Sequence, residues 1–276
     1  MAKVAWTQSN TRDVPSDSVR ALGPDKLHVV FQPIVDVATG KVFAHEALVR
    51  CKDPRFPSPP ALFEAAVAES ACGRLGRSIR DVAFSTCGAN ALFVNLHPQE
   101  LSSRWLVMAD DPIGFHEHGT YLEITESAAF EHFDVCMDVL KELCKRTGAH
   151  LVVDDFGAGY SNIERVADLA PAIVKLDLAL TRDVHERKAR QIVVRHVVAM
   201  CAELGARVVA EGVEKVEELV CMRDLGVSFA QGYLLARPAA PPPAAAWPLG
   251  PSARKPPPLP PNRSLTPRRT SKPPKR

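Results

Sequence analysis

Acidic and amide side chains and one lysine interrupt apolar, β-rich runs at widely separated places in this chain. The runs are otherwise made largely of Val, Ile, Leu and Phe, among which a charge is costly unless it is paired or binds a metal ion. The residues of this kind are Glu46, Asn95, Glu123, Asp154, Asp155, Lys175, Glu211 and Gln231. One such residue alone would be read as a structural ion pair. The whole set, at corresponding ends of separate runs, indicates a functional site.

The composition of this set favours hard cations. It offers carboxylate and amide oxygens without a His or Cys cluster, which suits Mg²⁺ or Mn²⁺ rather than structural zinc. Adjacent Asp154 and Asp155 would point to opposite sides of a strand, so we expect the strand to end there and the pair to contact two ions. Two-metal sites hydrolyse phosphate esters by in-line attack. Lys175 and Arg50 would stabilise phosphate oxygens, and Glu211 would accept the proton of water. The pattern predicts a metal-dependent phosphoesterase and does not name its substrate.

Eight β-rich runs must position these residues. They cover 28–35, 41–50, 91–97, 120–126, 150–155, 172–177, 206–211 and 228–233. The first two are joined by a turn around Thr39 and Gly40, so we expect them to pair antiparallel. Helical apolar spacing separates most of the others, with predicted helix ends at Gly148 and Gly205.

Alternating strands and helices indicate an α/β fold with a mainly parallel sheet. Eight strands within about 210 residues predict a compact (β/α)8 barrel, with a flat doubly wound sheet as the alternative. Active-site residues of such barrels lie at the carboxyl ends of the strands, where the polar set collects. The two-residue strand period also places Glu46, Leu48 and Arg50 on one face.

Charge is distributed unevenly along the 276 residues. The segment 238–276 holds 14 of the 24 prolines, eight basic residues and no acidic residue. The remainder therefore has 26 basic and 32 acidic residues, which gives no reason to expect DNA or RNA binding. No apolar run of about 18 residues is present, so we expect no membrane span. Seven scattered cysteines without a C-x-x-C pair, and a polar start, predict a cytoplasmic protein with reduced thiols.

These patterns divide the chain into three parts. Residues 1–26 are expected to be a short polar leader with at most one short helix, and 27–238 the folded domain. Residues 239–276 form a Pro-rich and basic tail that is expected to be disordered. The tail is either a solvated extension or a ligand for an unidentified protein partner, and composition favours the first.

Seven motifs follow one another across residues 27–238. They are FQPIVDVATGKVFAHEALVR (31–50), VNLHPQEL (94–101), LEITES (122–127), DDFGAGYSN (154–162), VKLD (174–177), VAEGVE (209–214) and QGYLLARP (231–238). In this order they closely resemble the EAL domain family of cyclic di-GMP phosphodiesterases. The resemblance implies a modified (β/α)8 TIM-like barrel with an antiparallel first strand. It also implies hydrolysis of cyclic di-GMP to linear pGpG with two Mg²⁺ or Mn²⁺ ions.

The same resemblance implies roles for individual residues. The implied metal ligands are Glu46, Asn95, Glu123, Asp154 and Asp155. Glu211 resembles the general base, and Lys175 the residue that positions water and phosphate, with Gln231 beside them.

Further positions resemble the family's nucleotide contacts and its mobile loop. Gln32, Leu48 and Arg50 match residues that contact the nucleotide, Arg50 through a phosphate. Glu126 and the segment 156–161 match the loop whose glutamate couples the metal site to a dimer interface. A homodimer is therefore expected.

The chain departs from the family pattern in places. Cys51 stands where a tryptophan often follows the Glu-Ala-Leu-x-Arg motif, and His97 where a serine is common. The crossover between Asn95 and Glu123 is also short. These changes remove no ligand, and we expect them to act on guanine contacts or the dimer surface. His97 is expected to be a hydrogen-bonding residue at the rim, and Cys51 a packing residue.

Two functions remain open at this stage. Retention of every acidic ligand, the lysine and the base favours an active phosphodiesterase. The alternative is a non-catalytic cyclic di-GMP receptor that signals through the tail or a partner. A weaker interpretation makes the tail the functional part and the barrel its carrier.

Overall fold

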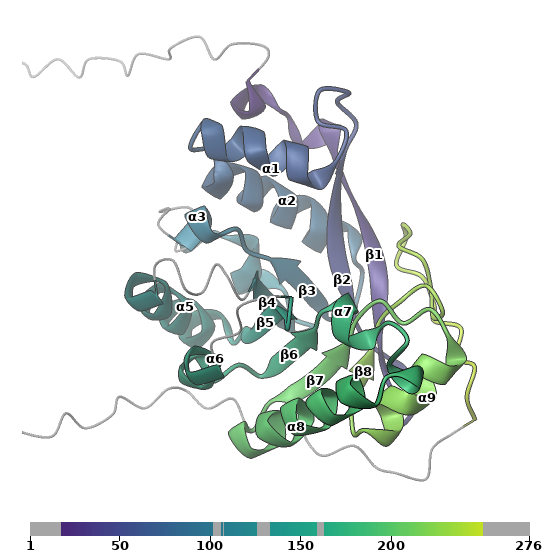
Figure 1. The fold of residues 1–276 in the computed structure, drawn as a ribbon. Helices are drawn as coiled ribbons and strands as arrows, with labels where there is room; N and C mark the ends of the chain where they lie inside the picture. Colours follow the sequence, from purple (N-terminus) through teal and green to yellow (C-terminus); the bar gives the residue numbers. More distant parts are fainter. Residues whose placement is uncertain (1–17, 102–105, 107, 126–132, 159–162, 251–276) are drawn as a thin grey trace, which may run out of the picture.

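The computed structural model describes residues 18–101, 106, 108–125, 133–158 and 163–250. Eight strands close into one barrel in sequence order (Figure 1). They are β1 Leu27–Asp36, β2 Val42–Cys51, β3 Leu92–Asn95, β4 Thr120–Thr125, β5 His150–Phe156, β6 Ile173–Leu176, β7 Arg207–Ala210 and β8 Phe229–Ala230. The predicted barrel is confirmed, and the flat doubly wound sheet is wrong.

The first strand runs against both of its neighbours. β1 pairs antiparallel with β2 over its length and with β8 through Val35↔Ala230 and Asp36↔Phe229. The other neighbouring strands are parallel. The turn between β1 and β2 includes Gly40, whose φ of 70° lies in the left-handed region that favours glycine. The predicted antiparallel first pair is therefore confirmed.

Helices cover the barrel and form a lobe at one end of it. Figure 1 shows two helices side by side next to the part of the β1–β2 ribbon that extends beyond the other strands. They are α1 Pro59–Ala68 and α2 Cys72–Thr86. The other helices are α3 Pro98–Leu101, α5 Phe133–Thr147, α6 Ile163–Leu169, α7 Leu178–Thr181, α8 Lys188–Leu204 and α9 Val216–Asp224. The short 3₁₀ turns are η1 Val19–Ala21, η2 Pro24–Lys26, η3 Pro112–Phe115 and η4 Val184–Glu186. None of the helices among the described residues has the length and apolarity needed to cross a membrane.

The two helix ends expected at glycines are observed. α5 is followed by Gly148 with a φ of 74°, and α8 by Gly205 with a φ of 79°. A left-handed residue after the last turn lets backbone N–H groups reach the final carbonyls, as Gly205 N–H does with Ala202.

Buried apolar residues form separate clusters. One fills the barrel interior, a larger one lies between strands and outer helices, and a third belongs to the α1–α2 lobe. Val19 and Leu22, from the predicted polar leader, are buried in the lobe cluster. The lobe therefore has a core of its own beside the mouth of the barrel.

Residues 239–250 contact the barrel, although they lie within the predicted disordered tail. Ala239 exchanges two backbone hydrogen bonds with Phe31, of 2.8 and 3.0 Å. The Nε2 atom of His45 lies 3.0 Å from the carbonyl oxygen of Pro243. Trp247 packs against the larger core cluster and touches the Gly40 turn. The structure therefore shows residues 239–250 packed against β1 and β2, where the sequence predicted disorder.

Candidate active site

The polar residues singled out in the sequence gather at one mouth of the barrel. Parallel strands share one direction, so their carboxyl ends meet. Asn95 at the end of β3 lies beside Glu123 on β4. Glu46 on β2 lies beside Gln32 on β1, because the antiparallel register places them opposite each other. The barrel therefore brings together residues that are far apart in the sequence.

Lys175 is the centre of this group and is 1% exposed. Its Nζ atom lies near four carboxylates from four other strands or strand ends. The distances are 2.6 Å to Glu123 Oε1, 2.8 Å to Glu211 Oε1, 3.1 Å to Asp154 Oδ1 and 3.4 Å to Glu46 Oε2. One positive charge therefore faces four acidic groups, which leaves an excess of negative potential.

Burial and charge set the protonation of this cluster. Burial alone would lower the pKa of Lys175, but the surrounding carboxylates outweigh it and raise the pKa well above its usual value. Burial, reinforced by the charge of Glu46, raises the pKa of Glu123 well above its ordinary range. Burial likewise raises the pKa of Glu211 to about 8, with Lys175 opposing. The cluster thus retains a charged lysine and holds carboxyl groups that resist ionisation in the absence of another cation.

Glu46 is held by amide groups as well as by Lys175. Asn95 Nδ2 donates to Glu46 Oε1 at 3.2 Å, and Gln231 Nε2 donates to Oε2 at 2.6 Å. Burial would raise the pKa of Glu46, but Lys175 and these two donors outweigh burial and lower it. The Gln231 amide also donates to Gln32 Oε1 at 3.2 Å. Glu46 is therefore an ionised carboxylate in a fixed orientation.

The adjacent aspartates do not end their strand as expected. β5 continues to Phe156, and its pairing with β6 shifts register between Val153 and Phe156. Asp155 has a φ of 58°, a left-handed conformation that an aspartate tolerates better than most residues. This bulge turns the two side chains toward a common point. Oxygen atoms of Asp154, Asp155 and Glu211 all lie within 4.8 Å of one another.

These residues fit a hard divalent cation. The donors are carboxylate and amide oxygens, the ligands that Mg²⁺ and Mn²⁺ prefer. Glu123 Oε2 is buried and has no hydrogen-bond partner among the described residues. An orphaned carboxylate oxygen inside a cluster with excess negative charge is what a bound cation would satisfy.

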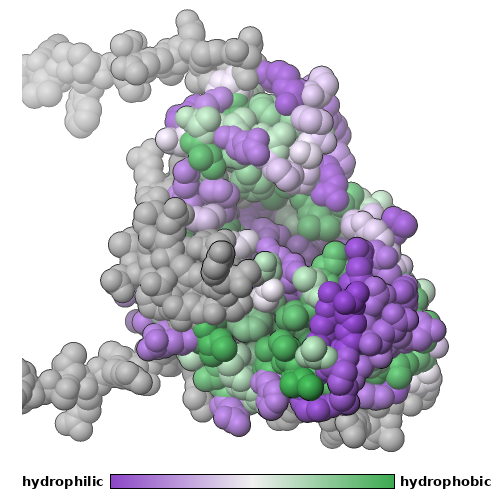
Figure 2. Space-filling view, viewed as in Figure 1, coloured by the Kyte–Doolittle hydropathy of each residue, from purple (hydrophilic) through white to green (hydrophobic). Residues whose placement is uncertain are grey.

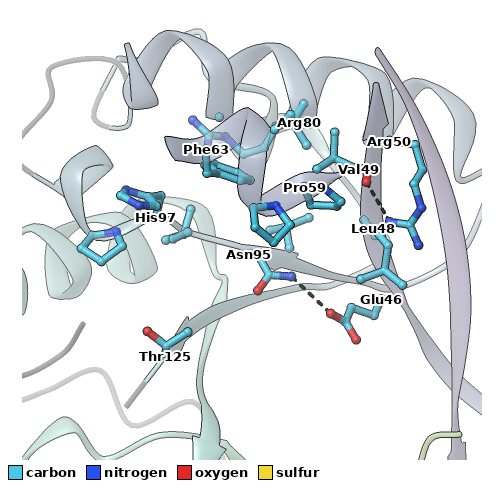
Figure 3. A pocket seen from close by; sticks show the side chains of 17 residues that line it. Glu46, Leu48, Val49, Arg50, Pro59, Phe63, Arg80, Asn95, His97 and Thr125 are labelled. Atoms are coloured by element: carbon cyan, nitrogen blue, oxygen red, sulfur yellow. Dashed lines mark hydrogen bonds between the residues drawn. The ribbon is translucent and has the colours of Figure 1, made fainter. Parts of the chain in front are cut away.

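A cavity of about 530 Å³ adjoins the cluster. It lies between the α1–α2 lobe and the mouth of the barrel, where Figure 2 shows the surface hollowed below the lobe. Glu46 and Asn95 line one part of it, and Phe63 and His97 line another (Figure 3). Its volume is in the range of small-molecule sites, which are mostly apolar with a few convergent polar groups. The cavity is the natural place for an organic substrate whose reacting group lies at the acidic cluster.

The predicted nucleotide-contact residues fall around this cavity and cluster. Leu48 and Arg50 line the cavity, and Arg50 Nη1 donates to the carbonyl oxygen of Val49 at 2.8 Å. Gln32 lies at the cluster through Gln231. Glu126 and residues 159–161 of the predicted loop lie outside the described residues. The homodimer, the cytoplasmic location and a partner for the tail stay predictions.

Sequence reasoning missed a buried ion-pair network beside the cavity. Arg80 on α2 donates through Nη1 to Glu100 Oε2 at 2.6 Å and through Nη2 to Asp111 Oδ2 at 2.7 Å. Glu100 Oε1 in turn accepts the His97 N–H at 3.0 Å. Gly76 permits this approach, because a Cβ there would lie 1.9 Å from Glu100 Oε2. The one sequence signal was a charge on the apolar side of a helix, and nothing indicated its distant partners.

Comparison with known proteins agrees with this geometry. The EAL domain family model matches residues 17–238. The cyclic di-GMP phosphodiesterase PdeR of Escherichia coli (strain K12) is 31% identical over 246 residues, which cover 84% of this chain and 36% of PdeR. This chain thus spans about a third of the length of that relative.

Solved structures with bound nucleotide are also similar. Klebsiella pneumoniae BlrP1, in complexes with cyclic di-GMP and calcium or manganese, has a TM-score of 0.70 and 33% identity over 79% of this chain and 57% of that chain. A standalone EAL protein of Vibrio cholerae O395, in its c-di-GMP-bound form, has a TM-score of 0.66 and 26% identity. That match covers 80% of this chain and 95% of the Vibrio chain.

Proposed function

Since the chain belongs to the EAL domain family, we propose that it is a phosphodiesterase that hydrolyses cyclic di-GMP to linear pGpG and depends on Mg²⁺ or Mn²⁺. The observation that carries this proposal is the convergence of four carboxylates on buried Lys175, beside a cavity of nucleotide size. Relatives that bear the phosphodiesterase name and cyclic di-GMP complexes of similar fold support it.

The metal ions would be held by oxygen ligands from four strands. The proposed ligands are Glu46, Asn95, Glu123, Asp154 and Asp155. When bound, two divalent ions would stabilise the phosphate oxygens and lower the pKa of a water molecule. The orphaned Glu123 Oε2 and the close Asp154, Asp155 and Glu211 oxygens support this assignment.

Two residues act directly on the hydrolysis. Glu211 accepts a proton from the attacking water while the new P–O bond forms and the bond from phosphorus to the ribose 3′-oxygen breaks. Burial raises the pKa of Glu211 in the metal-free cluster, and bound cations would lower it, so that the carboxylate is ionised and can accept the proton. Lys175, fixed 2.8 Å from Glu211, orients that carboxylate and offsets charge on the phosphate. The leaving oxygen takes its proton from solvent, which completes one cleavage.

Four further residues bind and orient the nucleotide. Arg50 leaves the Val49 carbonyl to contact a phosphate, and Leu48 packs against the nucleotide in the cavity. Gln32 and Gln231 hold each other and Glu46 at the border between cavity and cluster. Their amide groups keep the Glu46 carboxylate aimed while substrate enters.

Turnover of cyclic di-GMP by the purified protein, with Mg²⁺ or Mn²⁺, tests the proposal. Wild type should form pGpG, Glu46→Ala should form none, and Glu211→Gln should lose about 10²–10⁴-fold in kcat. Glu203→Gln, on the exposed surface of α8, is the matched control and should keep full activity. If the wild type binds cyclic di-GMP but forms no product, the enzyme is contradicted and the receptor alternative is supported.

A further inference from the structure

Two aromatic rings stack beside the cavity on the far side of Asn95 from Glu46. Phe63 comes from α1 and His97 from the segment after β3, and both line the cavity (Figure 3). Their ring centroids lie 5.5 Å apart and their planes differ by 8°. A planar base that enters the cavity can stack on the Phe63 ring beside His97, and base–aromatic stacking is favourable for every base.

The backbone contacts of His97 fix which ring nitrogen carries the proton. The Gln99 N–H donates to His97 Nδ1 at 3.2 Å, so Nδ1 has no proton and Nε2 carries it. The ring therefore presents Nε2–H as a hydrogen-bond donor.

The buried network described above holds His97 in place. Glu100, which accepts the His97 N–H, is fully buried and ion-paired with Arg80. All three side-chain nitrogens of Arg80 donate hydrogen bonds, Nη1 to Glu100 and Nε and Nη2 to Asp111. Arg80 lines the cavity but is thus committed to its carboxylates, and the Asn95 amide is committed to Glu46. The His97 ring is the donor best placed to read a base at this end.

We propose that Phe63 and His97 select guanine, with the base stacked on the Phe63 ring beside His97 and its O6 atom accepting a hydrogen bond from His97 Nε2–H in the plane of the imidazole. This inference rests on the proposed function, which places the reacting phosphate at Glu46 and Asn95 and leaves the other end of the cavity for a base. On its major-groove edge guanine presents N7 and O6 as acceptors, whereas adenine presents N7 and the N6 amino donor. On that edge only a contact to O6 discriminates, because both bases share N7.

Dissociation constants for cyclic di-GMP, cyclic di-IMP and cyclic di-AMP test the assignment. They are measured by calorimetry with Mn²⁺ in the full chain carrying Glu211→Gln, so that turnover does not consume the ligand. Adding His97→Ala should weaken binding of the two O6-bearing ligands about tenfold and leave cyclic di-AMP within about twofold. His97→Gln, which keeps an N–H donor, should retain most of the preference. His118→Ala, at an exposed histidine, should change none of the constants.

A separate variant tests the stacking of the base on Phe63. Phe63→Leu keeps apolar volume but removes the ring, so it should weaken all three ligands by a similar factor and leave their ratio unchanged. Thermal unfolding of each variant shows that it is folded before binding is compared.

The outcomes separate this inference from the proposed function. Equal weakening of all ligands by His97→Ala, or no weakening, overturns guanine selection even when wild type hydrolyses cyclic di-GMP. Tight guanine-selective binding that depends on His97, in a wild type without turnover, supports the inference and overturns the phosphodiesterase. A wild type that neither binds nor hydrolyses cyclic di-GMP overturns both.

Discussion

At the scale of single residues, Lys175 is the most consequential charge in the barrel. It is 1% exposed and lies within 3.4 Å of four carboxylates, which would otherwise repel one another in a poorly solvated site. Breaking a buried ion pair by removing one partner leaves uncompensated charge and is strongly destabilising. The lysine therefore stabilises the metal-free barrel as well as serving the reaction proposed for it.

Replacing this lysine should make stability depend on metal. In EDTA we expect Lys175→Met to lower the free energy of unfolding by about 3–5 kcal/mol. Mn²⁺ should raise the free energy of unfolding by more in the variant than in wild type, because bound cations replace the lost positive charge. Urea unfolding with and without Mn²⁺ measures both effects.

The control for this prediction is Lys141→Met, at an exposed position of α5. It should change the free energy of unfolding by no more than about 0.5 kcal/mol, as surface substitutions commonly do. If Lys175→Met were as stable as wild type in EDTA, the carboxylates would be protonated or solvated and the lysine would not be their counter-charge.

At the scale of elements, a buried network joins α2, α3 and η3. Arg80 on α2 is fully buried with Glu100 from α3 and Asp111 at the start of η3. One helical turn earlier, Arg77 pairs with Asp110 at 2.9 Å, but the Asp110 side chain is 66% exposed. The two pairs have the same chemistry and different burial, so they form a natural comparison.

Removing the two arginines should have very different costs. Arg80→Met leaves two buried carboxylates without a partner, and we expect a loss of about 3–5 kcal/mol in the free energy of unfolding. Arg77→Met removes an exposed pair and should cost at most about 1 kcal/mol. Chemical denaturation of both variants measures the difference. Similar losses would mean that water reaches the Arg80 network and that burial does not set its contribution.

The sequence predicted the strands and helices better than it predicted how they contact one another. All eight strands follow from apolar runs and turn residues, and the helix ends follow from Gly148 and Gly205. The bulge at Asp155 was not predictable, because a register shift depends on how β5 meets β6. The same reason hid the Arg80 network, whose partners lie 20 and 31 residues away along the chain.

The candidate site shows the same limit. Glu46, Asn95, Glu123 and Lys175 were predictable because a polar residue within an apolar strand is unusual, and the barrel then places strand ends together. Phe63 carried no such signal, since an aromatic residue in an apolar helix such as α1 normally packs in a core. Its position beside His97 is a property of the α1–α2 lobe and became visible only in three dimensions.

At the scale of the whole molecule, residues beyond the last strand add to the pairing along β1. β8 offers β1 only two pairs, at Val35 and Asp36. Further along β1, Phe31 exchanges hydrogen bonds with Ala239 instead. The segment 239–250 then continues across β2, with Pro243 at His45 and Trp247 at the Gly40 turn. The segment 239–250 therefore pairs with a part of β1 that the short strand β8 does not reach.

Two truncations separate the packed segment from the residues that follow it. A chain ending at 250 should match the full chain in the free energy of unfolding, because it keeps every contact just described. A chain ending at 238 loses two backbone hydrogen bonds and the apolar contacts of Trp247, and we expect a loss of about 3 kcal/mol. Hydrogen exchange at the Phe31 amide should accelerate in the shorter chain only, because its acceptor is the Ala239 carbonyl. Equal stability and equal exchange in the two chains would show that β1 and β8 close the barrel unaided, and the domain would then end at 238.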